Sequence, residues 1–173
     1  MPLPSTMTPI ATNTLVSAGS SVTFSSIPQG YTDLFLQVNN LMSGASGFKL
    51  RFNGDSGSNY SETYMSGYAG SAASSRLSNQ SSIYNNLVYG DSTTASVFTP
   101  HIIQLQNYSN ATTFKSLLWR YGTTTSAGGN GEVTAMVGLW RSTAAITSIE
   151  ISAWNAVNFA IGSSFTLYGI KAA

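Results

Sequence analysis

Two short stretches decide the fold class, Asp33-Leu-Phe-Leu-Gln-Val-Asn39 and Phe48-Lys-Leu-Arg-Phe-Asn53. In both, apolar and polar residues alternate with a period of two, the period with which side chains alternate between the faces of a β-strand. The first stretch also has Phe35 on its polar side, which indicates that this second face is partly covered. Each strand is therefore expected to turn one face to a core and the other to solvent or a neighbour.

Similar bursts recur along the chain at intervals of about ten residues, separated by polar turn formers. The expected strands cover residues 9–16, 21–25, 34–38, 48–52, 81–88, 96–106, 114–121, 132–140, 147–154 and 164–170. The expected connections cover residues 53–59, 67–75, 107–113 and 123–131. No window shows an apolar stripe of helical spacing with caps. The pattern predicts an all-β protein, a single β-sandwich of jelly-roll type with about 8–10 short antiparallel strands and little or no helix.

The composition is that of a folded domain with an unusually uncharged surface. Charged residues make up 8% of the 173 residues, against roughly 25% in an average soluble domain. Aromatic residues at 12% and hydrophobic residues at 42% provide enough apolar surface for a core, which argues against disorder. The chain has no cysteine, so its stability must come from packing, and neither disulfides nor a thiolate metal site is expected.

The N-terminal segment, residues 1–14, is expected to be an extended arm ahead of a sandwich domain at residues 15–173. It contains three of the five prolines, Pro2, Pro4 and Pro9, which suit an extended conformation. It lacks the basic and apolar regions of a secretory signal, and no apolar run is long enough to span a membrane. A soluble product that does not follow the general secretory route is expected.

The charge of the chain points to self-association. The formal net charge is +1, so there is little repulsion to oppose burial of an exposed apolar patch, and a homo-oligomer is expected. The seven Lys and Arg residues are scattered along the sequence. No run of them could neutralise a row of phosphates, so nucleic-acid binding is not expected.

The residues that could carry catalysis are few. His101 is the one histidine, and neither a nucleophile elbow nor a carboxylate lies near it in sequence, so a structural or interface histidine is preferred. The six carboxylates are dispersed, although a fold could still bring two of them to glycosidase spacing. They are Asp33, Asp55, Glu62, Asp91, Glu132 and Glu150. The chain is expected to have no catalytic, cofactor-binding or metal-binding residues.

One turn invites a calcium-binding interpretation. Asn53, Asp55, Ser58 and Asn59 place several oxygen atoms in a glycine-rich segment. The spacing departs from that of an EF-hand loop and supplies a single carboxylate, so any site would be weak. A hairpin turn is preferred, because Asn-Gly and Asp-Ser-Gly supply the positive φ angles that such a turn needs.

The aromatic residues are the strongest candidates for binding. Trp119, Trp140 and Trp154 lie in or at the end of expected strands; they could be core residues, interface anchors or a platform for stacking sugars. Core positions are preferred over interface positions. The residues assigned to an interface are Leu3, Pro4, Pro9, Ile10 and Trp140.

The sequence also resembles small structural proteins of tailed bacteriophages, particularly those infecting cyanobacteria and other aquatic bacteria. The similar segments are Thr6-Met-Thr-Pro-Ile-Ala-Thr12, Leu50-Arg-Phe-Asn-Gly-Asp-Ser-Gly-Ser-Asn-Tyr-Ser61, Ile103-Gln-Leu-Gln-Asn-Tyr-Ser109, Gly138-Leu-Trp-Arg-Ser-Thr-Ala-Ala-Ile-Thr-Ser-Ile149 and Gly162-Ser-Ser-Phe-Thr-Leu-Tyr-Gly-Ile-Lys-Ala-Ala173. None of them is a catalytic signature. The resemblance implies a virion component with a compact β-sandwich, used for capsid decoration or in a fibre or spike.

These observations lead to the expectation of a non-enzymatic bacteriophage virion structural protein. The favoured role is a capsid decoration or cement protein, a homotrimer made in the host bacterial cytoplasm that contacts the major capsid protein or other virion proteins. The alternative is a tail or head fibre or spike module that binds a host receptor or glycan. No cofactor and no membrane contact are expected.

Overall fold

The computed structural model describes residues 6–44, 46–84, 97–124 and 131–171. Within these residues it contains twelve β-strands and no helix. The strands form two antiparallel sheets, so the expected all-β sandwich is confirmed. Jelly-roll connectivity stays a prediction.

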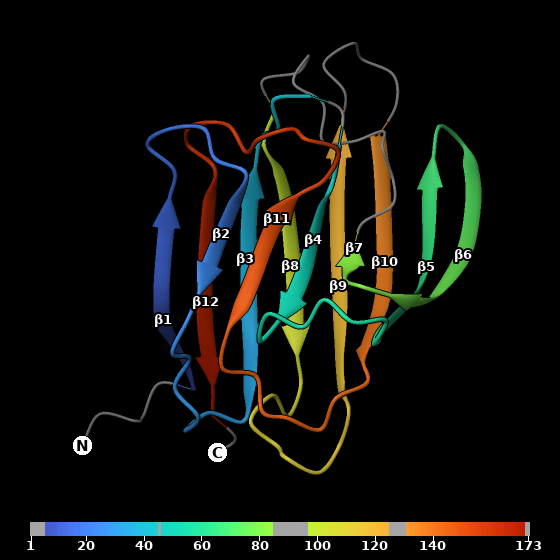
Figure 1. Cartoon of the computed structure of the whole chain (residues 1–173). Helices are drawn as coiled ribbons and strands as arrows, with labels where there is room; N and C mark the ends of the chain where they lie inside the picture. The colour runs from blue at the N-terminus through green and yellow to red at the C-terminus, as the bar shows by residue number, and fades with distance from the viewer. Residues whose placement is uncertain (1–5, 45, 85–96, 125–130, 172–173) are drawn as a thin grey trace.

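The larger sheet has eight strands in the order β1-β12-β3-β8-β9-β10-β5-β6. In that order they are Met7–Thr14, Ser164–Ile170, Asp33–Asn40, Thr99–Leu105, Lys115–Thr124, Gly131–Trp140, Tyr60–Tyr68 and Ser71–Gln80. The smaller sheet has the order β2-β11-β4-β7, formed by Ser21–Phe24, Ile149–Ala153, Phe48–Phe52 and Ile83–Tyr84. Figure 1 shows the small sheet lying over the middle of the large one, with the β5–β6 hairpin extending to one side of it.

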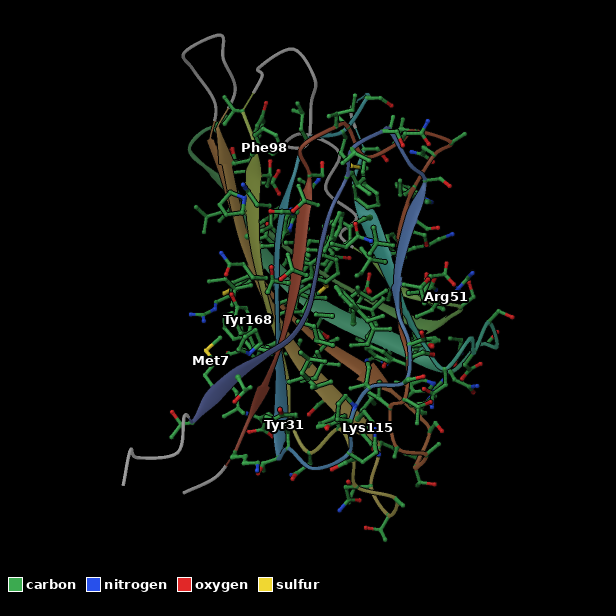
Figure 2. All side chains as sticks on the ribbon, turned by 90° about the vertical axis from the view of Figure 1, so that its left-hand side faces the viewer. Met7, Tyr31, Arg51, Phe98, Lys115 and Tyr168 are labelled. Atoms are coloured by element: carbon green, nitrogen blue, oxygen red, sulfur yellow. The ribbon has the colours of Figure 1, made fainter. Side chains whose placement is uncertain are left out.

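The core lies between the two sheets and is filled by one side chain in every two. In β3, Leu34, Leu36 and Val38 are fully buried, as their alternation predicted. Phe48, Leu50 and Phe52 of β4 face them from the small sheet and are buried to the same degree. Figure 2 views the two layers edge-on. Because both sheets contribute alternate residues, the core is formed jointly by the two of them.

The hairpin β5–β6 is the main part of the fold that the sequence did not predict. Residues 67–75 were expected to be a connection, but they lie within two strands joined by the two-residue turn Ala69-Gly70. Both turn residues have positive φ angles, 48° and 80°, as a type I′ hairpin turn requires. β6 has no apolar alternation because nearly all its residues are exposed. A strand that contributes little to a core leaves no period-two signal in the sequence.

The segment expected to be a free arm is mostly part of the sheet. β1 pairs with β12 from Met7 to Thr14, with a bulge between Pro9 and Ala11. Residues 7–14 are therefore an edge strand of the large sheet. The expectation of an arm that extends away from the domain is wrong for these residues, because their backbone groups pair with β12. Residues 1–5 lie outside the described part of the chain.

Candidate interaction surface

The candidate functional site is the outer side of the large sheet, the side turned away from the small sheet. In β10, Glu132, Thr134, Met136 and Trp140 point inward, while the alternate residues point outward. The outward Val133 and Val137 are 69% and 50% exposed. This strand is unusual in turning valines to solvent and a glutamate to the interior. It therefore has an apolar outward side that none of the described residues covers.

The neighbouring strands extend this apolar side into one patch. Met65 of β5 lies opposite Ala135, and Leu118 of β9 lies opposite Val137. The side chains of Met65 and Leu118 are 65% and 44% exposed. We call ten outward residues of β5, β9 and β10 the outer patch: Thr63, Met65, Gly67, Leu118, Arg120, Gly122, Val133, Ala135, Val137 and Leu139.

The shape of the outer patch follows from its small residues. Val133 lies between Gly67 of β5 and Gly122 of β9 in register, so no side chain flanks it. Hollows open beside it, lined by Met65, Ala135 and residues of β6. A second hollow lies between Met65, Leu118 and Val137. The patch thus has protruding side chains and, beside them, hollows into which apolar side chains of a partner could pack.

Charged side chains are scarce within the outer patch, although the same side of the large sheet also carries Arg76 of β6, which lies opposite Thr63. Among the described side chains of the outer patch, Arg120 is the one charged group. The outer side of the small sheet carries Lys49, and Arg51 opposite Glu150. In Figure 2, Met7 and Tyr168 project from the large-sheet side and Arg51 from the other. Since water solvates charges better than methyl groups, the outer patch suits a protein contact.

The turn at residues 53–59 is held by hydrogen bonds that occupy its oxygen atoms. Asp55 Oδ2 accepts from Trp140 Nε1 at 2.7 Å and from Asn59 Nδ2 at 2.9 Å. Asp55 Oδ1 accepts from the amide of Gly57 at 2.8 Å, and Asn53 Oδ1 accepts from the amide of Thr147 at 2.8 Å. The Trp140 hydrogen bond lowers the pKa of Asp55 below its ordinary value. The geometry favours a turn over a calcium site, but the expectation of a hairpin is wrong. The turn joins β4 of the small sheet to β5 of the large sheet, and these two strands do not pair.

His101 is part of the core. Its side chain is fully buried and packs against the rings of Phe48 and Tyr121, with centroids 4.7 and 4.9 Å away. Trp119 Nε1 donates a hydrogen bond to its Nδ1 at 3.2 Å. A buried imidazole held on one nitrogen by tryptophan and enclosed by aromatic rings has no access to a substrate, which supports the structural role.

Two carboxylates are buried on the inward side of the large sheet, but they do not form a catalytic pair. Glu62 lies opposite Gly138, and Glu132 lies opposite Tyr68. Six residues of strand separate the two positions, or about 20 Å at the usual rise per residue. Glycosidase pairs are roughly 5 to 9.5 Å apart. The described residues contain no cluster of three or more His, Cys, Asp or Glu side chains that could hold a metal ion.

Each buried glutamate has its own environment. Glu62 Oε2 accepts from the amide of Tyr84 at 2.9 Å, while its Oε1 has no partner among the described residues. Burial raises the pKa of Glu62 to about 7. Glu132 Oε1 accepts from the hydroxyls of Tyr121 and Thr134 at 3.3 and 3.0 Å. Both side chains are buried between the two sheets. Their spacing in the sequence did not predict this burial.

The residues assigned to an interface from the sequence are only partly accessible. Trp140 is 2% exposed and packs on Phe52 and Tyr60, so its assignment to an interface is wrong for the folded chain. Pro9 is exposed and Ile10 is half-buried against the core. Leu3 and Pro4 lie outside the described residues.

The other two tryptophans occupy different environments. Trp119 is fully buried, as the preferred core assignment predicted. Trp154 is half-buried, and its ring lies 5.5 Å from that of Tyr84. Lys49 pairs with Tyr84 and Gly47 accepts from the Trp154 amide, which places the two rings at the outer side of the small sheet.

No family model, no curated protein and no solved structure matches this chain. The described residues contain no helix with the length and hydropathy needed to cross a membrane.

Proposed function

We propose that this chain is a non-enzymatic structural subunit that works by packing its outer patch against other proteins of a larger particle. The observation that carries the proposal is the exposure of Met65, Leu118, Val133 and Val137 side by side on three adjacent strands. A contiguous apolar area of this kind marks an interaction surface. Its protruding apolar side chains and shallow hollows fit the surface of another protein better than a small polar substrate.

We propose that the particle is a bacteriophage virion and that the chain decorates its capsid. The resemblance of several segments to virion proteins of tailed bacteriophages supports this assignment. The exposed apolar residues of the outer patch support an orientation in which this patch faces the shell and the small sheet faces solvent. Many such contacts of modest individual affinity give a large total affinity for an assembled shell.

A fibre or spike module that binds a glycan is the second candidate. The pair Tyr84 and Trp154 favours it, because two half-buried rings at the outer side of the small sheet can stack on sugars. A glycan array probed with the wild-type chain and with Trp154→Ala distinguishes the candidates. Reproducible binding that Trp154→Ala abolishes would support the fibre role and count against decoration.

The decoration proposal is tested with a charge variant of the outer patch. We expect Val133→Lys together with Val137→Lys to lower occupancy on particles that lack the protein by at least tenfold, because each lysine would have to be desolvated at the contact. Both positions are solvent-exposed, so the fold should persist, as circular dichroism would check. The matched control is Thr23→Lys on the outer side of the small sheet, which should bind normally.

Shell stability gives the second measurement of the same experiment. Particles that carry the wild-type chain should break at higher temperature than depleted particles, because a ligand that binds the intact shell stabilises it by mass action. Particles offered the double lysine variant should behave as depleted ones. Unchanged occupancy and unchanged shell stability with the double variant would overturn the proposal.

A further inference from the structure

The two edges of the large sheet differ in how well they are protected from another strand. β1, at one edge, contains Pro9, which has no amide hydrogen, and has a bulge between Pro9 and Ala11. Proline and bulges are devices that prevent a foreign strand from pairing. β6, at the other edge, has no proline, and Arg76 is its one charged residue. From Ser71 to Leu77 its register with β5 is regular.

β6 is also exposed on both of its faces. Its residues are exposed except Leu77 and Gln80, which are half-buried. Figure 1 shows why, since the β5–β6 hairpin extends beyond the small sheet. The strand thus contributes little to the core and leaves one row of backbone N–H and C=O groups directed away from β5. Such an edge is a template for a further strand.

We infer that β6 pairs antiparallel with β6 of a second copy of this chain, about a two-fold axis perpendicular to the sheet. Antiparallel pairing of identical strands is two-fold symmetric, so each copy donates and accepts the same backbone hydrogen bonds. The contact joins the two large sheets into one continuous sheet. It also turns both outer patches to the same side, so that both can contact one partner surface.

The charges of β6 fit this pairing. The centre of the regular segment is Ser74, and an axis there places Ala73 opposite Ser75 and Ala72 opposite Arg76. Like charges directly opposite each other would destabilise the pair, and Arg76 meets an alanine instead. With a formal net charge of +1 on each chain, the copies repel each other little. The inference predicts a dimer in place of the trimer expected from the sequence.

A cysteine scan tests the pairing directly, because the chain has no cysteine of its own. With a perpendicular axis one residue of β6 lies opposite its own copy, with Cα atoms about 4.5 to 5.5 Å apart. One step along the strand away from the axis offsets the two copies of a residue by about 6.8 Å along the strand, so their Cα atoms lie about 8 to 9 Å apart. A disulfide needs about 4.4 to 6.8 Å. Among single cysteines at Ala72, Ala73, Ser74 and Ser75, oxidation should therefore cross-link one position at least tenfold more than the others.

The control is a single cysteine at Ala11 in β1, the edge strand that Pro9 and a bulge protect from pairing, and it should give background cross-linking. A second measurement uses Ser74→Pro and Ser75→Pro. The amides of neighbouring strand residues point to opposite sides, so one proline removes an outward amide and the other an amide directed at β5. One variant should convert the dimer to a folded monomer in sedimentation, at tens of micromolar. A wild-type monomer, or cross-linking without a peak in β6, would overturn the inference.

This inference rests on the proposed function only in treating the chain as an assembly subunit, and the two can fail separately. The cross-linking scan needs no particle. If the chain dimerises through β6 but substitutions in the outer patch do not change particle binding, the inference about β6 holds and the proposed function is wrong. If the chain is a monomer and its particle binding depends on Val133 and Val137, the proposed function holds and the inference about β6 is wrong.

Discussion

Replacing Glu62 by glutamine should change how the stability of the chain depends on pH. The carboxyl group is buried, and one of its oxygens has no partner among the described residues. Burial raises its pKa from 4.5 to about 7, against the opposing effect of the hydrogen bond from the Tyr84 amide. Glutamine has the shape of the protonated acid and keeps an oxygen that can accept from Tyr84. The variant therefore imitates the protonated state at every pH.

The sign and size of the effect follow from the raised pKa. A carboxyl whose pKa is higher in the folded state than in the unfolded state favours folding when protonated. This contribution is fully present below pH 4.5 and is lost as the pH rises through about 7. Each pKa unit is worth about 1.4 kcal/mol, so the loss approaches about 3 kcal/mol at alkaline pH.

The measurement is urea unfolding of the wild-type chain and Glu62→Gln at several values between pH 4.5 and 8.5. We expect similar free energies of unfolding at pH 4.5 and a more stable variant at pH 8.5, by up to about 3 kcal/mol. Glu150→Gln at the outer side of the small sheet is the matched control and should retain the wild-type pH dependence. A variant that is no more stable than the wild type at pH 8.5 would show that burial of Glu62 does not set this pH dependence.

Two further substitutions test the packing and the turn. Gly169→Ala should destabilise the chain by about 1–3 kcal/mol, because its Cβ would lie 2.4 Å from the ring of Tyr31; thermal unfolding measures this, and an unchanged melting temperature would contradict it. Asp55→Ala should cost on the order of 2 kcal/mol, since it removes the acceptor of Trp140 and Asn59. Adding calcium should not stabilise the wild-type turn, and a calcium-dependent rise in its melting temperature would revive the ion-binding interpretation.

The exposure of the outer patch could not be predicted from the sequence. Residues 132–140 alternate with a period of two, but both sets of alternate residues contain apolar side chains. Hydropathy alone would bury Val133 and Val137 and expose Glu132. The structure does the opposite, because pairing with β9 and β5 places Trp119 and Tyr60 on the same side as Met136 and Trp140. A period-two pattern predicts that a strand has two faces, but it does not say which one is inward.

The fold class and most of the strands could be predicted from the sequence alone. Alternation in residues 33–39 and 48–53, the scarcity of charge and the absence of helical stripes sufficed, because each is a local property of the chain. Tertiary structure decided which side of β10 is exposed, that Trp140 is buried, and that residues 60–80 form an exposed hairpin. These depend on which strands are neighbours. The pairing of β10 with β5 joins residues far apart in the chain, and β6 contributes little to the core, so neither leaves a local pattern from which it could be predicted.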